Sequence, residues 1–125
     1  MNPKTIVYWG STSLVALALL MALTYLSGSE QVVSGFAKAG YPQHLRIVLG
    51  IVKPVAAIVL LIPGFAVLKE WAYAGVTFAW VMAFISAYLS GEGAATWILP
   101  PALLVLLAIS YVTRPPSRRL KQVPA

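Results

Sequence analysis

The sequence predicts an all-α, membrane-embedded four-helix bundle with a short amphipathic helix between helices one and two. Two observations support this fold class. The 125 residues are 60% hydrophobic and 10% charged, with a mean hydropathy of +0.85, whereas soluble domains contain about 25% charged residues. The apolar residues also form four runs of about 20, the length that a helix needs to cross the hydrocarbon core. We therefore expect a single transmembrane domain over residues 1–125, with no separate soluble domain.

The first apolar run extends over residues 5–26. A cleaved signal peptide is the alternative, because Lys4 precedes the run. However, the run is longer than the apolar core of about 7–15 residues in signal peptides, and no A-x-A cleavage site follows it. In the mixed segment 27–43, Ser29 is a candidate N-cap, and Gly40 can end a helix in the left-handed conformation. This segment predicts a short amphipathic helix at the membrane interface.

The three remaining membrane helices are predicted from their apolar runs. They are expected at residues 44–68, 71–89 and 94–112, followed by a basic tail at residues 113–125. Lys69-Glu70 and Ser90–Gly93 are interpreted as the turns between them. Because proline removes a backbone donor, we expect kinks at Pro54, Pro63 and Pro100.

The distribution of basic residues predicts the orientation. With the N-terminus inside, the cytoplasmic basic residues are Lys4, Lys69, Arg114, Arg118, Arg119 and Lys121, and the external ones are Lys38 and Arg46. Positively charged flanks of membrane helices stay in the cytoplasm. We therefore expect a multi-pass protein of the cell's inner (plasma) membrane with both termini cytoplasmic.

Composition argues against several classes of function. The chain has no cysteine, one histidine and three acidic residues, so neither thiol chemistry nor a metal site is expected, and no cofactor is evident. A serine–histidine–aspartate triad is excluded because aspartate is absent. The net charge of +6 follows from topology, so the expected partner is the lipid bilayer and not nucleic acid.

Lys53 is the residue that most strongly suggests a site. It lies about nine residues, or roughly 13 Å, into the second helix and therefore near the midplane. An ionised lysine at that depth costs about 2.5–3.5 kcal/mol, so it faces the protein interior or water. Arg46 shares its helix face, and Glu30 and Glu92 are the acids expected on the outer side. We predict an outward-opening cavity with Lys53 paired to Glu92 or Glu30; a purely structural ion pair is the alternative.

The third predicted helix has two stripes of side chains. The first combines aromatic rings and hydroxyl groups: Tyr73, Thr77, Trp80, Phe84 and Tyr88. The second consists of small residues at every fourth position: Gly75, Ala79, Ala83 and Ala87. Small stripes are typical of packing between membrane helices. The aromatic stripe is a candidate lining for a pocket that binds a flat or prenylated molecule, and core or lipid contact is the alternative.

Several short segments, in order along almost the whole chain, resemble the DoxX-like family of small four-helix membrane proteins. The most specific is the octet Leu68–Gly75 (LKEWAYAG), followed by Phe78. The others are Tyr8-Trp9, Ser11-Thr12, Gly40-Tyr41-Pro42, Lys53, Gly91-Glu92-Gly93, Pro100 and Ser110-Tyr111. Many relatives have a histidine near the end of helix three, where this chain has Tyr88, so histidine-dependent chemistry is not expected.

The resemblance implies a function by analogy, because distant relatives include a subunit of a thiosulfate–quinone oxidoreductase. The leading hypothesis is a bundle that binds a small hydrophobic or quinone-like ligand, or an accessory subunit of a membrane oxidoreductase complex, without catalysis of its own. One alternative is an enzyme that uses Lys53 and Glu92 for proton transfer. Another is a structural assembly partner. A small multidrug-type transporter is disfavoured, because residues 5–26 lack the membrane-embedded carboxylate that such exporters need.

Overall fold

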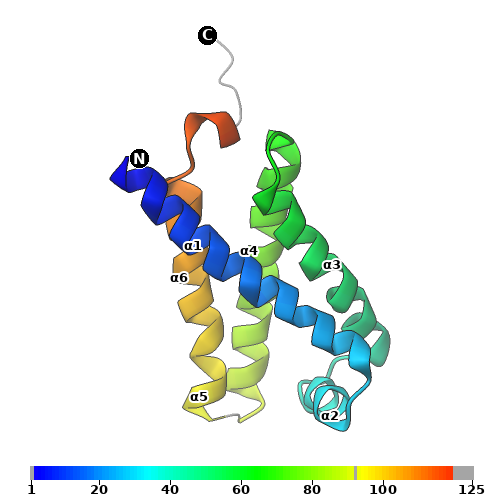
Figure 1. The fold of residues 1–125 in the computed structure, drawn as a ribbon. Coiled ribbons are helices and arrows are strands. Elements are labelled where there is room, and N and C mark those ends of the chain that lie inside the picture. The colour runs from blue at the N-terminus through cyan, green and yellow to red at the C-terminus, as the bar shows by residue number, and fades with distance from the viewer. Residues whose placement is uncertain (1, 92, 120–125) are drawn as a thin grey trace.

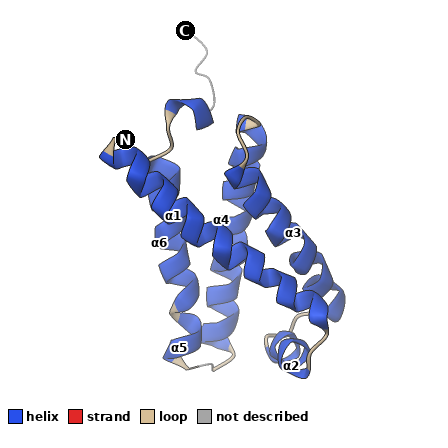
Figure 2. Cartoon of the chain, viewed as in Figure 1, coloured by secondary structure: helices blue, strands red, loops and turns tan. Residues whose placement is uncertain are grey.

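The computed structural model describes residues 2–91 and 93–119, and these residues form helices joined by short loops (Figure 2). The elements are α1 (Pro3–Leu20), the 3-10 helix η1 (Met21–Ser27), α2 (Glu30–Lys38), α3 (Gln43–Leu61), α4 (Ala66–Leu89), α5 (Ala94–Trp97), α6 (Leu99–Val112) and the 3-10 helix η2 (Pro116–Arg118). Four stretches are long and apolar enough to span a membrane: Pro3–Ser27, Gln43–Leu61, Ala66–Leu89 and Ala94–Val112. The predicted all-α membrane bundle is confirmed.

The four long stretches alternate in direction. The start of α1, the turn between α3 and α4, and η2 lie at one end of the bundle, which we call the terminal end (Figure 1). Helices α2 and α5 lie at the opposite end. α1 runs diagonally across the bundle and packs against α3 and α6, while α4 packs along α6. Both ends of the described chain therefore lie on the same side of the bundle.

A small apolar core holds the helices together. It is formed by Val15, Ala16, Leu19, Ala57, Leu60, Tyr73, Val76, Trp80 and Leu107, which come from α1, α3, α4 and α6. Large apolar side chains also cover the outer surface, and Phe78 is 72% exposed while Leu89 is 77% exposed. Water would solvate such a surface poorly, whereas lipid tails match it. The protein is therefore an integral membrane protein.

The short helix between the first two spans forms as predicted. The Ser29 side chain caps α2 by accepting a hydrogen bond from the backbone N–H of Val32 at 3.4 Å. After the helix, Gly40 adopts a positive φ of 81°, a conformation that glycine reaches without steric cost. The capping signals therefore fixed this helix correctly at both ends.

The predicted boundary between the second and third membrane helices is wrong. α3 ends at Leu61 and not at residue 68, and α4 already begins at Ala66 and not at Trp71. The turn lies at Pro63-Gly64, where Gly64 has a φ of 79°. Lys69-Glu70, predicted to be the turn, belongs to α4. Two adjacent charges suggested a solvated loop. Instead, Lys69 donates to backbone carbonyls, including that of Val59, and Glu70 forms an ion pair with Arg114.

The prolines inside the apolar runs have different effects. α3 continues through Pro54 without interruption. The last span is divided at Ile98, which separates α5 from α6, and Pro100 lies in the first turn of α6. Proline is tolerated there because the first N–H groups of a helix have no partner within the helix. The expected bend near Pro100 is therefore present as a break in the helix.

Candidate ligand-binding site

A cavity of about 620 Å³ lies between α3 and α4. These helices diverge from their turn at the terminal end, and α2 lies beside the opening at the other end (Figure 1). The α3 wall contains Leu45, Leu49 and Lys53, the α4 wall contains Ala79, Met82, Ala83, Ser86 and Ala87, and α2 adds Val32, Phe36 and Ala39. A cavity around Lys53 that opens away from the terminal end is what the sequence predicted.

Small residues of α4 create much of this space. Ala79, Ala83 and Ala87 line the cavity, so they do not serve as a packing surface for another helix of the chain, as their spacing predicted. Ser86 lies on the same wall and shares a hydrogen bond with Tyr41. Ser86 lies beside the small stripe in the sequence, and a polar residue at that place was the signal that this face does more than pack.

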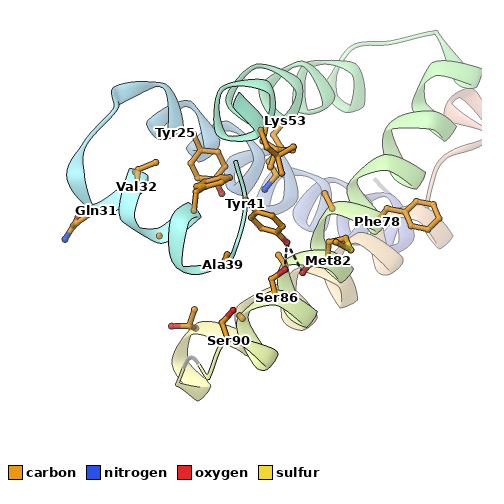
Figure 3. Close-up of a pocket in the computed structure, with 18 residues that line it drawn as sticks. Tyr25, Gln31, Val32, Ala39, Tyr41, Lys53, Phe78, Met82, Ser86 and Ser90 are labelled. Carbon is orange, nitrogen blue, oxygen red and sulfur yellow. Dashed lines mark hydrogen bonds between the residues drawn. The ribbon is translucent and has the colours of Figure 1, made fainter. Parts of the chain in front are cut away.

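Lys53 supplies the cationic group of the cavity. Its half-buried side chain points into the space (Figure 3), and its Nζ lies 5.3 Å from the centre of the Tyr25 ring. A cation over an aromatic face is attracted by the negative charge of the ring face. Within residues 2–91 and 93–119, no carboxylate forms an ion pair with Lys53.

The other charged residues predicted near Lys53 have separate surroundings. Glu30 is exposed in the first turn of α2, so the predicted Lys53–Glu30 ion pair is not present. Glu92 lies outside the described residues. Arg46 binds the end of the first span, donating to the backbone carbonyl of Tyr25, and it also donates to Gln43 Oε1 at 2.9 Å. Arg46 therefore holds η1 against α3 and does not line the cavity.

Tyr41 connects the loop before α3 to α4. Its hydroxyl shares a hydrogen bond with the Ser86 hydroxyl and donates to the Met82 carbonyl at 3.3 Å (Figure 3). Neither Tyr41, noted only within the family-like segment Gly40-Tyr41-Pro42, nor Ser86 was predicted from the sequence as a site residue. These hydroxyl groups place hydrogen-bonding capacity on an otherwise mainly apolar wall.

The aromatic stripe of α4 does not line this cavity. Tyr73 and Trp80 are buried in the core. Tyr73 and Thr77 also border a second groove of about 550 Å³ between α4 and α6. Tyr88 is 59% exposed and packs against Phe84 and Trp97, with ring centres 6.0 and 5.9 Å away. The stripe is divided because α4 contacts the core at the middle of the helix but not at its far end.

At the terminal end, two cations complete the C-terminus of α3. Lys69 is 1% exposed, and its Nζ donates to the carbonyls of Val59 at 2.7 Å, Gly64 at 2.8 Å and Ile62. The Arg118 guanidinium donates to the carbonyls of Leu60 at 2.9 Å, Leu61 at 3.1 Å and Ile62 at 3.1 Å.

These bonds replace ones that the helix cannot make. The carbonyl of Val59 would normally accept from the N–H four residues later, but that residue is Pro63, which has none. The last carbonyls of the helix, at Leu60 and Leu61, have no later helical N–H to accept from. Lys69 and Arg118 supply the missing donors, so their role at this position is structural.

A hydrogen-bonded cluster joins α1, α4 and α6 at the same end. The Ser110 hydroxyl lies 2.7 Å from the Tyr73 hydroxyl and 2.5 Å from the Thr12 hydroxyl. Nearby, Glu70 forms an ion pair with Arg114 and accepts a hydrogen bond from the Tyr111 hydroxyl at 2.9 Å. The expected basic tail therefore folds back onto the bundle at Arg114 and Arg118, both of which are buried.

The model of the DoxX-like family matches residues 10–110. The chain belongs to the DoxX-like family. The match includes all residues of α2, α3, α4 and α5, and therefore both walls of the cavity. No curated protein and no solved structure matches the chain significantly. Within this DoxX-like chain, the octet at residues 68–75 contains Lys69, Glu70 and Tyr73, so its polar residues stabilise the terminal end.

Proposed function

We propose that this DoxX-like protein binds a small hydrophobic, quinone-like molecule from the bilayer in the cavity between α2, α3 and α4. The observation that carries the proposal is the cavity, about 620 Å³ in volume and bordered mainly by apolar side chains. Ligand sites typically enclose about 300–1,000 Å³ and combine an apolar lining with a few polar groups that fix orientation. Lys53, Tyr41 and Ser86 are the candidates for that orienting role.

The chemistry of these groups suits a ring that carries carbonyl oxygens. The Lys53 ammonium can donate to one carbonyl oxygen, and the hydroxyl groups of Tyr41 and Ser86 can bond to another polar atom. The alanine wall of α4 leaves room for a flat ring. A prenyl tail would extend past Phe78 and Met82, which are exposed on the lipid-facing surface. The second groove is less suitable because its carboxylate, Glu70, already pairs with Arg114.

Filling the cavity should weaken binding without removing any polar group. In the Ala83→Leu variant, the larger side chain occupies space that the ligand needs, so we expect at least about a tenfold increase in Kd, equivalent to about 1.4 kcal/mol. The measurement is equilibrium binding of a decyl-substituted benzoquinone to purified protein in a neutral detergent. Ala102→Leu is the matched control, because Ala102 is exposed on α6 and lines neither cavity.

Equal weakening in both variants would place the quinone on the general apolar surface. Absence of saturable quinone binding to the unmodified protein would refute the ligand-binding function. Native mass spectrometry of gently extracted protein tests the separate role of an accessory subunit. A copurifying oxidoreductase subunit would support that role, and a protein recovered without any partner would oppose it.

We also propose that the terminal end is cytoplasmic and the end with α2 and α5 is external, in the cell's inner (plasma) membrane. Five basic residues of the described chain lie toward the terminal end, namely Lys4, Lys69, Arg114, Arg118 and Arg119. Positively charged flanks are retained in the cytoplasm. The absence of cysteine allows clean labelling of single-cysteine variants at exposed positions of the two ends.

A membrane-impermeant maleimide should label Ser90→Cys in intact cells, because Ser90 is exposed at the external end. The same reagent should label Asn2→Cys only after the membrane is opened. The reversed pattern, with Asn2→Cys labelled in intact cells and Ser90→Cys protected, would establish the opposite orientation.

A further inference from the structure

We propose that the cavity between α3 and α4 takes an amphiphile with an anionic head group, a carboxylate or a phosphate, with Lys53 as its counter-ion. This inference rests on the proposed ligand-binding function and specifies the charge of the ligand. A neutral molecule such as a quinone can accept a hydrogen bond from Lys53, but it brings no negative charge, and within residues 2–91 and 93–119 no carboxylate pairs with the ammonium group. The inference therefore concerns the head group and not the existence of the site.

The first argument is the placement of Lys53. Its half-buried side chain lines the cavity from α3 (Figure 3). It lies in a helix that spans the membrane, where an ammonium group needs an anion, a polar partner or water. The Tyr25 ring at 5.3 Å is a weak partner, because a cation–π contact does not neutralise the charge.

The second argument is the set of charges around the cavity. The described residues contain two acids. Glu30 is exposed at the start of α2, and Glu70 is paired with Arg114 at the terminal end. Neither lines the cavity. Arg46, on the same helix as Lys53, adds a further positive charge and is bound to the Tyr25 carbonyl and to Gln43. Within residues 2–91 and 93–119, Lys53 is thus the charged residue that lines the cavity, and no acidic residue lines it.

The third argument is the position of the cation within an apolar space. Leu49 and Met82 line the cavity together with Lys53, and they match an acyl or alkyl chain. The hydroxyl groups of Tyr41 and Ser86, which bond to each other, are uncharged, so Lys53 is the lining side chain that can neutralise an anion. An anion-headed amphiphile would place its head on Lys53 and its chain against the apolar wall. The Coulomb attraction between the two charges is stronger in a low-dielectric site than in water, and charge-assisted hydrogen bonds are the stronger ones.

The test compares ligands that share one alkyl chain and differ in head-group charge. Decanoate, decanol and decylamine are titrated against purified protein in a neutral maltoside detergent, and the decyl-substituted benzoquinone is included as the reference for the proposed function. We expect decanoate to bind at least about tenfold more tightly than decanol, because charge-assisted hydrogen bonds are the stronger ones. Decylamine should bind more weakly than decanol.

Two variants of Lys53 connect this preference to one side chain. Lys53→Met keeps the length of the side chain but removes its charge, so decanoate and decanol should bind equally. Lys53→Glu reverses the charge and should shift the preference to decylamine. An unchanged elution volume in size-exclusion chromatography and an unchanged unfolding temperature would show that each variant retains its fold. If Lys53→Glu fails to fold, the comparison of the unmodified protein with Lys53→Met is sufficient.

The outcomes separate the inference from the function on which it rests. If the unmodified protein binds the quinone but prefers decanol or decylamine to decanoate, the site stands and the anionic head group is refuted. A decanoate preference that survives in Lys53→Met also refutes the role of Lys53. If no probe binds saturably, the ligand-binding function itself fails. If decanoate is preferred and the preference depends on Lys53, a titration with a short-chain phosphatidylglycerol distinguishes a phospholipid head group from a single-chain acid.

Discussion

In the Lys69→Met variant, we expect the free energy of unfolding to fall by about 3–5 kcal/mol. Methionine preserves the apolar stem but provides no donor for the carbonyls of Val59, Ile62 and Gly64. Each buried acceptor that loses its partner costs about 1–3 kcal/mol. The loss should be large because the carbonyl of Val59 has no alternative helical donor, owing to Pro63.

Unfolding of the purified protein by a denaturing detergent in mixed micelles measures this change. Lys4→Met is the matched control, because Lys4 is exposed near the start of α1 and its side chain makes none of the described hydrogen bonds. The control should unfold like the unmodified protein. Equal stability of the Lys69 and Lys4 variants would show that Lys69 does not complete the end of α3.

The second large effect is expected for Glu70→Gln. Glutamine keeps the shape of the side chain and can still accept a hydrogen bond from Tyr111, but it leaves the buried Arg114 guanidinium without its ion-pair partner. Breaking a buried ion pair on one side typically costs about 3–5 kcal/mol. Because the Glu70 side chain is 22% exposed, we expect a smaller loss of about 2–3 kcal/mol.

A double-mutant cycle with Arg114→Met isolates the energy of the pair. In the double variant, which lacks both charges, the total loss of unfolding free energy should be smaller than the sum of the losses in the two single variants. Glu30→Gln provides the control, since Glu30 is exposed and has no ion-pair partner among the described residues. Strictly additive losses at positions 70 and 114 would contradict coupling between them.

The sequence predicted the parts of the fold that depend on hydrophobicity and on local capping. Apolar length identified four spans, and Ser29 with Gly40 marked both ends of α2. The sequence misplaced the turn between α3 and α4, because the buried role of Lys69 depends on carbonyls contributed by another helix. Charged residues are rarely fully buried, so adjacent Lys69 and Glu70 indicated a loop. The Pro63-Gly64 signal was present but was interpreted as a kink.

The candidate site was predicted in its location but not in its lining. Lys53 was placed correctly in the cavity, because a charge deep in an apolar run needs a polar environment. For the two stripes on α4, the packing role expected of the small residues was wrong and the core alternative for the aromatic stripe holds at Tyr73 and Trp80. Spacing indicates which residues share a face but not what that face meets. Ala79, Ala83 and Ala87 border the cavity, whereas Tyr73 and Trp80 fill the core. Whether the small residues of α4 pack against another helix or border a cavity depends on how far α3 lies from α4, which the spacing of residues along α4 does not reveal.

The cap on α3 also has a consequence for biosynthesis. Chains are made from the N-terminus, and domains begin to form in that order. The Val59 carbonyl can be satisfied once Lys69 emerges, but the carbonyls of Leu60 and Leu61 depend on Arg118, which follows α6. The hairpin of α3 and α4 is therefore made before its last hydrogen-bond donor exists. The end of α3 can therefore be completed only after α4, α6 and the segment that contains Arg118 have been made.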